Sequence, residues 1–310
     1  MTENISVVII TRNREKMLGR CLESLVSQTR LPDEVVVVDN ASTDNTKKVI
    51  LSFKEKLPIR YVQELKIGIP YARNRGLQHT TGSLILMLDD DCSANKFWVE
   101  RMAYAHKKYP KAWVIQGRTF SLPKRGLYSA LVESDRLLWL LYHSKKGLSL
   151  RKMKSFFNKD FRDETAVFTC DTRNFSIKTS YLKKHKLFFD LDFYRGSDTD
   201  LGEQILQKNG LIIFCSSVTV DHWERPNLAQ FLEQRWHIGR TTARVGNKWK
   251  TPSFISNIPR LKTLLALFLF CQHLNQLRKL PILMILLLLD RLYRINGWFY
   301  EKRILSFSKH

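Results

Sequence analysis

The chain has 310 residues, of which 44% are hydrophobic, so it can form one large α/β domain with an appendage or two smaller domains. Its five cysteines are scattered and include no Cys-x-x-Cys pair, which argues against a disulfide framework and a zinc site. The formal net charge of +22 leaves nucleic acid, an anionic membrane and acidic small molecules as candidate partners. The N-terminal segment lacks the features of a signal peptide, and we expect a protein that faces the cytosol.

Unbroken apolar runs in the N-terminal part predict strands that are buried on both faces of a sheet. These runs are residues 5–10, 34–39 and 84–88, with a weaker strand at 60–63. Segments with helical spacing follow them, at 15–28, from about 45, at 70–79 and at 95–109. The resulting βαβαβαβ order is typical of a doubly wound, mostly parallel sheet, so we predict an α/β fold.

The last of these apolar runs leads directly into three consecutive carboxylates, Asp89, Asp90 and Asp91. Ligands of open α/β sheets bind at the carboxyl ends of the strands, where Thr11 and Asp39 also lie in this chain. Adjacent carboxylates repel one another unless a cation neutralises them, and Mg²⁺ or Mn²⁺ prefers such oxygen ligands. The alternative is that one Asp caps the following helix and the others are solvated.

No Gly-x-Gly-x-x-Gly segment and no Gly-Lys-Ser/Thr loop follows these strands, which argues against a dinucleotide-binding dehydrogenase and excludes a P-loop phosphate site. Beyond the helix at 95–109 the pattern is less regular. There, residues 145–159 carry six basic side chains, which predict a mobile lid, a membrane-touching loop or a solvated basic loop. Strands are again expected at 211–214 and 218–220, followed by a helix from about 227.

Five segments of the chain resemble, in order and spacing, motifs of the inverting family 2 glycosyltransferases of the GT-A fold. They are residues 7–14, 38–44, 68–76, 88–91 and 196–201. Together they cover roughly residues 5–240. The resemblance implies a GT-A catalytic domain at 1–245, with a Rossmann-like nucleotide-sugar-binding half at 1–118 and an acceptor half at 119–245. A helical extension would follow at 246–310.

The resemblance also implies which residues hold a nucleotide-sugar donor. Asp39 would bind the imide N–H of a uracil-type base, and Thr11, Asn13 and Arg14 would line the nucleotide pocket. Arg73 would face the pyrophosphate or the ribose, a task that suits its guanidinium fork. The alternatives are that Asp39 caps a helix and that Arg73 is a surface charge.

In the same resemblance, the three carboxylates form a DxD-type motif. Asp89 and Asp90 would bind the donor, Asp89 through the ribose or a metal-bound water. Asp91 would ligate the Mn²⁺ or Mg²⁺ ion that bridges the diphosphate. His222 is similar to a residue that completes the metal shell in some relatives, although a lone His beside a Trp is more often a packed surface residue.

Asp198 matches the base that takes the acceptor proton in this family. The family usually has Glu immediately before this Asp, and this chain has Ser197, which leaves open whether Asp200 shares the task. The alternative is that both carboxylates form the acidic first turn of a helix. Processive relatives carry Gln-x-x-Arg-Trp, and Leu232 stands at the Gln position here, so we expect one sugar per encounter.

We therefore predict a metal-dependent, inverting glycosyltransferase that moves one sugar from a nucleoside diphosphate sugar, UDP-linked, to a hydroxyl of a lipid-linked acceptor or a cell-envelope glycan such as lipopolysaccharide. One alternative is a nucleotidyltransferase acting on sugar phosphates, but that class ordinarily has a Gly-rich loop where residues 11–14 have no Gly. Another is a basic nucleic-acid-binding protein. No recognisable module of that class is present, so no nucleic-acid partner is expected.

The C-terminal segment is both basic and apolar. Residues 225–310 hold 15 basic and 3 acidic side chains, and the apolar runs 261–270 and 280–289 are each too short to cross a bilayer. Basic and aromatic residues flank these runs, which favours a peripheral or monotopic protein on an anionic, cytoplasmic membrane face. The alternative is that these helices pack on the catalytic domain or on a second subunit, and the sequence leaves the oligomeric state open.

Overall fold

The computed structural model describes most of the chain. The described residues are 3–124, 126–143, 155–157, 161, 163–225, 227–250, 261–273, 275 and 277–307. They form two compact units, Met1–Phe120 with Arg162–His222 and Ser121–Phe161 with Trp223–His310. The basic stretch at 145–159, predicted as a lid or loop, lies outside the described residues apart from 155–157.

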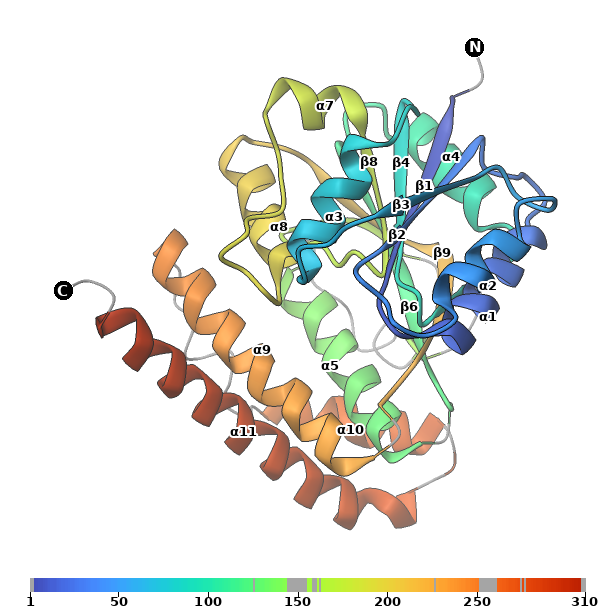
Figure 1. Ribbon diagram of the computed structural model, residues 1–310. Coiled ribbons are helices and arrows are strands. Elements are labelled where there is room, and N and C mark those ends of the chain that lie inside the picture. The colour runs from blue at the N-terminus through green and yellow to red at the C-terminus, as the bar shows by residue number, and fades with distance from the viewer. Residues whose placement is uncertain are drawn as a thin grey trace. The chain divides into compact units, whose positions relative to one another are not determined.

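The first unit is built on a nine-stranded sheet in the order β3-β2-β1-β4-β8-β6-β9-β5, with β7 paired to β9 (Figure 1). Its parallel part comprises β1 (Ile5–Thr11), β2 (Glu34–Asp39), β3 (Ile59–Gln63) and β4 (Leu84–Leu88). Every residue of β2 and β4 is buried, as the apolar runs predict. Thr11 lies opposite Asp39 in the register of β1 and β2, so both residues reach the carboxyl edge.

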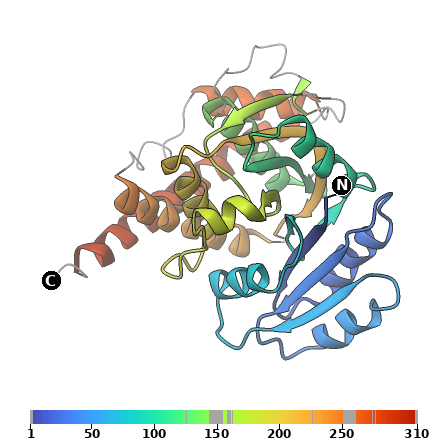
Figure 2. The ribbon, with the colours of Figure 1, turned by 90° about the horizontal axis from the view of Figure 1, so that it is seen from above.

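Helices cover both faces of these strands, because successive strand residues point to opposite sides. The helices are α1 (Glu15–Val26), α2 (Thr46–Ser52), α3 (Ile69–Gln78) and α4 (Trp98–Lys108). Val7 of β1 belongs to the core cluster that contains Leu18 of α1. On the other face, a Cβ at Gly76 of α3 would lie 2.5 Å from a Val8 methyl group, so glycine allows α3 to sit directly on the sheet. Figure 2 shows α3 in cyan on one side of these strands and α1 and α2 in blue on the other.

The remaining strands join the sheet by antiparallel pairs. They are β5 (Cys92–Ala94), β6 (Val114–Leu122), β7 (Glu164–Val167), β8 (Asn174–Lys178) and β9 (Ile212–Trp223), and helices α7 (Thr179–Lys184) and α8 (Ser197–Gln207) accompany them. The two strands expected at 211–214 and 218–220 are one continuous strand, β9. The predicted α/β class with a doubly wound sheet is confirmed, and its parallel pairs join β1, β2, β3 and β4.

The second unit consists mainly of helices. They are α5 (Leu127–His143), α9 (Leu228–Trp249), α10 (Leu261–His273), the 3-10 helix η2 (Leu277–Lys279) and α11 (Leu280–Phe307). A Cβ at Gly239 would lie 1.9 Å from the Arg294 carbonyl oxygen, and one at Gly297 would lie 2.1 Å from that of Trp236, so α9 and α11 pack backbone to backbone. The predicted helical extension is confirmed, while the predicted boundaries at 118 and 245 stay predictions. Among the described residues, no helix has the length and apolar character of a membrane span.

Replacing Gly239 by Ala should destabilise the helical unit, because the added methyl group has no room beside the α11 backbone. Overpacking of this kind costs about 1–3 kcal/mol of unfolding free energy. Gly19 of α1 is the matched control, since a Cβ there meets Val49 at 3.8 Å, and Gly19→Ala should be neutral or stabilising. Thermal unfolding measures both variants, and equal melting temperatures would contradict the close packing.

Candidate functional site

The loop after β4 carries the three consecutive carboxylates at the edge of the sheet. The Cys92 amide donates to the Asp89 carbonyl oxygen at 3.0 Å, which closes a tight turn between β4 and β5. β5 then pairs with the end of β9, with Cys92 opposite His222. This pairing makes neighbours of Asp91 and His222, which are far apart in the sequence.

Asp90 and Asp91 share one cation, the Arg14 side chain. Its Nη1 atom lies 2.9 Å from Asp90 Oδ1 and 2.7 Å from Asp91 Oδ2. The Thr11 hydroxyl donates to Asp90 Oδ2 at 2.7 Å. Burial lowers the pKa of Arg14, but the two carboxylates outweigh burial and leave this pKa raised, so Arg14 keeps its charge. The structure thus brings four predicted site residues together, with Arg14 directed to the acidic loop.

Burial has the opposite effect on the pKa values of the carboxylates. It raises the pKa of Asp90 to about 7, although Arg14 lowers it, and that of Asp89 to about 6, although Arg73 lowers it. The charge of Asp91 adds to both increases. When all three carboxylates are ionised, the loop carries more negative charge than Arg14 and Arg73 offset, which favours the binding of a further cation.

Asp91 and His222 are the pair placed to bind a metal ion. His222 Nε2 lies 3.4 Å from Asp91 Oδ1, and both side chains are buried. Two ligands about 2.1 Å from an ion and at a right angle to each other lie about 3.0 Å apart, so the pair fits a shared Mg²⁺ or Mn²⁺. Within the part of the chain that the structure describes, no three His, Cys, Asp or Glu side chains form a metal site. The other ligands would come from substrate oxygens and water.

Asp39, at the end of β2, is buried and accepts two hydrogen bonds. The Ser42 amide donates to its Oδ1 at 2.9 Å, and the Tyr61 hydroxyl donates to its Oδ2 at 3.2 Å. Asn13, at a positive φ of 52°, accepts from the Thr43 amide at 2.7 Å. This bond ties the loop after β1 to the loop after β2. Asp39 is thus fixed at the sheet edge, and the predicted nucleotide contacts of Asp39 and Asn13 stay predictions.

Arg73 of α3 is buried and connects three parts of the first unit. It donates to Ser197 Oγ at 2.9 Å and to Thr172 Oγ1, and its Nη2 lies 4.0 Å from Asp89 Oδ1. Its guanidinium group also lies over the Phe189 ring, 5.3 Å from the centroid. Because only 6% of Arg73 is exposed, the alternative that it is a surface charge is wrong.

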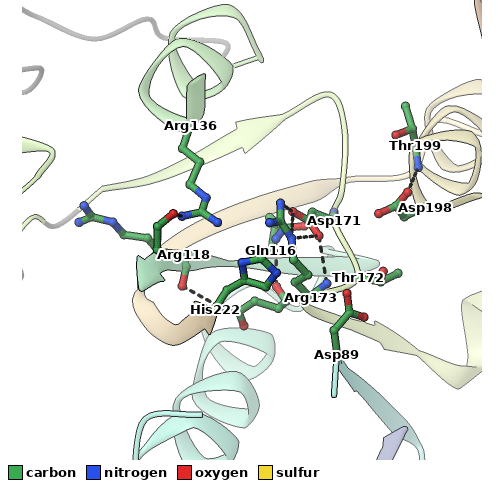
Figure 3. A network of polar contacts seen from close by, with 12 residues as sticks. Asp89, Gln116, Arg118, Arg136, Asp171, Thr172, Arg173, Asp198, Thr199 and His222 are labelled. Carbon is green, nitrogen blue, oxygen red and sulfur yellow. Dashed lines mark hydrogen bonds and ion pairs between the residues drawn. The ribbon is translucent and has the colours of Figure 1, made fainter. Parts of the chain in front are cut away.

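The first turn of α8 holds two carboxylates in different environments. Asp200 is fully buried and accepts from Gln204 Nε2 at 2.8 Å, so it belongs to the interior. Asp198 is half-buried, and its Oδ1 accepts from the Thr199 amide at 2.9 Å. Of these two carboxylates, Asp198 is the one that solvent reaches. Figure 3 shows its hydrogen bond with Thr199.

An ion pair that the sequence analysis did not single out lies in the loop before β8. Arg173 Nε donates to Asp171 Oδ2 at 2.8 Å, and the Asp171 amide donates to Gln116 Oε1 at 2.7 Å. In the view of Figure 3 this pair lies between His222 and Asp89. The charge of Asp171 adds to the burial that raises the pKa of Asp89, and Arg173 opposes it.

The register of β8 explains why sequence reasoning missed this pair. β8 runs antiparallel to β4, with Asn174 opposite Leu88. Residues that precede β8 therefore share the sheet edge with residues that follow β4. The signal in the sequence is the polar segment Asp-Thr-Arg at 171–173, directly before an apolar strand, whereas the rule for parallel sheets points to residues after a strand.

Residues 6–186, more than half of the chain, match the sequence profile of the family described as glycosyl transferase family 2. The chain belongs to this family. The predicted family and the predicted enzyme class are confirmed by this match. The predicted roles of single residues stay predictions.

Two curated relatives show how much of this chain has a similar sequence in other proteins. Glycosyltransferase GlyA of Streptococcus pneumoniae is 32% identical over 246 residues, which cover 76% of this chain and 32% of the relative. Validoxylamine A glucosyltransferase of Streptomyces hygroscopicus is 35% identical over 131 residues, which cover 41% of this chain and 29% of the relative. The matched part thus spans about a third of the length of these relatives.

Two solved structures share the fold of this glycosyltransferase. Mannosyltransferase PcManGT from Pyrobaculum calidifontis, in complex with GDP-Man and Mn²⁺, has a TM-score of 0.61 at 18% identity over 97% of this chain and 87% of that chain. TarS 1–349 of S. aureus, in complex with UDP-GlcNAc, has a TM-score of 0.55 at 18% identity over 97% of this chain and 92% of that chain. The predicted GT-A fold is confirmed.

The raised pKa values predict how the stability of the protein changes with pH. Unfolded Asp has a pKa near 3.9, so the native state binds protons more tightly than the unfolded chain at Asp89 and Asp90. This stabilisation is present below about pH 4 and is lost as the pH rises through about 6 to 7. We expect the fall in unfolding free energy between pH 5 and 7.5 to be smaller in Asp89→Asn than in the wild type. Denaturant unfolding at both pH values measures it, and equal falls would contradict the raised pKa of Asp89.

Proposed function

We propose that this protein moves one sugar from a UDP-linked donor to an acceptor hydroxyl, with inversion and with a divalent cation. The observation that carries the proposal is the position of Arg73. It donates to Ser197, the residue before Asp198, and lies 4.0 Å from Asp89. One buried side chain of the first unit therefore lies between a candidate donor-binding carboxylate, Asp89, and the helix turn that carries the candidate base.

In the proposed reaction, the acceptor oxygen attacks the anomeric carbon from the face opposite the nucleotide. A bond forms between this oxygen and the carbon while the bond from the carbon to the diphosphate oxygen breaks, which inverts the configuration. Asp198 takes the proton of the attacking hydroxyl. The half-buried position of Asp198 supports this role, and the burial of Asp200 against Gln204 argues that Asp200 does not share it.

We propose uridine as the nucleoside because of the environment of Asp39. Each carboxylate oxygen of Asp39 accepts one hydrogen bond from the protein and keeps further acceptor capacity. A carboxylate at this position suits the imide N–H of uracil, and Thr11, Asn13 and Arg14 come from the adjacent strand end and loop. TarS, which shares the fold, binds UDP-GlcNAc, and this supports a uridine donor here.

Asp91 and His222 would hold the Mn²⁺ or Mg²⁺ ion, and Asp89 and Asp90 would contribute negative charge to the site. When bound, the ion would neutralise the charge that develops on the leaving diphosphate. Arg14 donates to both Asp90 and Asp91, so it orients these carboxylates, and it lowers the pKa of Asp90 against the effect of burial. The Mn²⁺ bound to PcManGT supports the use of such an ion.

The proposed acceptor is a lipid-linked or cell-envelope glycan, and the proposed location is the cytoplasmic face of a membrane. The excess of basic residues in 225–310 supports an anionic surface as a partner. Leu232, in place of the Gln of processive relatives, supports the transfer of one sugar per encounter. Arg235 of the same segment is buried, 3.4 Å from Asp290, so it serves the packing of the helical unit.

Asp198→Asn should lower kcat for sugar transfer by about 10²–10⁴-fold, because an amide cannot take the proton of the attacking hydroxyl. UDP binding, measured as a shift in melting temperature, should stay the same. Glu203→Gln removes a half-buried carboxylate from the same helix and is the matched control, with activity expected near that of the wild type. Release of UDP with and without acceptor measures turnover, and full activity in Asp198→Asn would overturn its assignment as the base.

Asp91→Asn should remove the part of UDP-induced stabilisation that depends on Mn²⁺, because the ion loses a carboxylate ligand. A ligand present at 100 times its Kd stabilises the folded state by about 2.7 kcal/mol, which a thermal-shift screen over nucleoside diphosphate sugars detects. The same screen identifies the sugar. An unchanged Mn²⁺-dependent shift in Asp91→Asn would show that this residue is not a metal ligand.

A further inference from the structure

Four charged side chains of α11, those of Asp290, Arg291, Arg294 and Glu301, point into the helical unit. Asp290 and Glu301 are each 1% exposed, and Arg291 is 5% exposed. Asp290 accepts from Arg294 at 3.1 Å and lies 3.4 Å from Arg235 of α9. The buried face of α11 is therefore held by ion pairs as well as by apolar contacts.

The neighbouring helices supply the partners of these charges. Arg291 donates to Asp135 of α5 at 2.8 Å. Glu301 accepts from Arg240 at 2.7 Å and from Arg244 at 2.8 Å, both on α9. Buried charges that lose a partner are costly, so these pairs fix which face of α11 is turned inward.

The outer face of α11 is apolar. The exposed large side chains, each between 42% and 61% exposed, are Ile282, Ile285, Leu288, Leu292, Tyr293, Phe299 and Tyr300. Asn296 is the one polar residue among the exposed positions from 281 to 300, all of which the structure describes. At a rise of about 1.5 Å per residue this stripe is about 27 Å long. A helix that covers a soluble domain has the reverse pattern, with polar residues outward, and exposed apolar patches of this kind mark interaction surfaces.

Cations lie at both ends of this stripe and identify its partner. Arg278 and Lys279 precede α11, and Lys302 and Arg303 follow the stripe, with Arg278 and Arg303 exposed. A second copy of the chain, laid antiparallel on the stripe, would bring these cations together and be repelled. Lipid phosphates would instead attract them while the apolar side chains enter the headgroup boundary, which is how interfacial helices bind anionic membranes.

We propose that the outer face of α11 is a docking surface for an anionic lipid bilayer, with the helix lying parallel to the membrane plane. This inference deepens the proposed membrane location and rests on it, but it does not depend on the proposed sugar transfer. Leu265 and Phe268 of α10 are also exposed apolar residues of the same unit. Tyr293 and Tyr300 suit the headgroup level, where amphipathic rings gather.

Flotation of the full-length protein with phosphatidylglycerol–phosphatidylcholine vesicles at low salt tests this proposal. We expect the triple variant Ile285→Ser, Leu288→Ser, Leu292→Ser to reduce the partition coefficient at least tenfold. The matched control is Leu31→Ser, Leu65→Ser, Ile67→Ser, which removes three exposed apolar side chains from the first unit and should float like the wild type. All six positions are exposed, so we expect both variants to fold. The melting temperature of each variant checks this.

A second variant, Arg278→Glu with Arg303→Glu, should lose binding to anionic vesicles and leave the weaker binding to pure phosphatidylcholine unchanged. The proposal is overturned if the wild type ignores anionic vesicles, or if the α11 triple variant floats as well as its control. It is also overturned if sedimentation shows a dimer that the α11 variant dissociates, because a second copy would then occupy the stripe. Vesicle binding by a protein that fails to turn over any donor would reject the proposed sugar transfer and leave this surface standing.

Discussion

Mutual repulsion among three adjacent carboxylates is the constraint on which the first unit depends. Asp89, Asp90 and Asp91 are consecutive, so their charges cannot move apart without breaking the turn into β5. Two separate elements bring a compensating cation, Arg14 from the loop after β1 and Arg73 from α3, and the end of β9 brings His222 beside Asp91. Their convergence requires the sheet order that places β1 beside β4 and β5 beside β9. When all three carboxylates are ionised, the charges of Arg14 and Arg73 do not neutralise them, which is the condition in which a bound cation is favourable.

The parallel part of the fold was predictable because three of its four strands, β1, β2 and β4, are apolar runs that lead into polar residues. The antiparallel part was harder, because buried polar side chains interrupt its strands. Gln116 of β6 donates to the Asn174 carbonyl, and Asn174 of β8 accepts from the Trp98 indole, so both are buried without breaking their strands. A pattern based on hydrophobicity cannot tell such satisfied polar residues from a loop. The Asp171–Arg173 pair was missed for a related reason. It lies at the carboxyl edge of the parallel strands because β8 runs antiparallel to β4, and hydrophobicity does not indicate strand direction.

The departure from the family pattern at Ser197 has a consequence for the charge of the site. A Glu at this position would place a carboxylate where Arg73 now meets a neutral hydroxyl. The direct hydrogen-bond partners of Arg73 are the hydroxyls of Ser197 and Thr172, so its charge is left to act on Asp89 at 4.0 Å. Ser197 therefore keeps a hydrogen bond between α8 and Arg73 of α3. Because serine is neutral, it does not offset the positive charge of Arg73, which lies near Asp89. The Ser197 hydroxyl thus ties the first turn of α8 to Arg73 without adding a carboxylate there.

The helical unit shows why the C-terminal segment could be interpreted only in part from its sequence. The charges at Asp290, Arg291 and Arg294 look like the end of an apolar run, yet α11 continues through them to Phe307. They continue the helix because each meets an opposite charge inside the unit, where a paired ion is tolerated and an unpaired one is not. Because the charged face of α11 is buried, the opposite, apolar face points outward. The segment can be both basic and apolar because its charged and apolar side chains point in different directions. The packing of α5, α9 and α11 determines these directions.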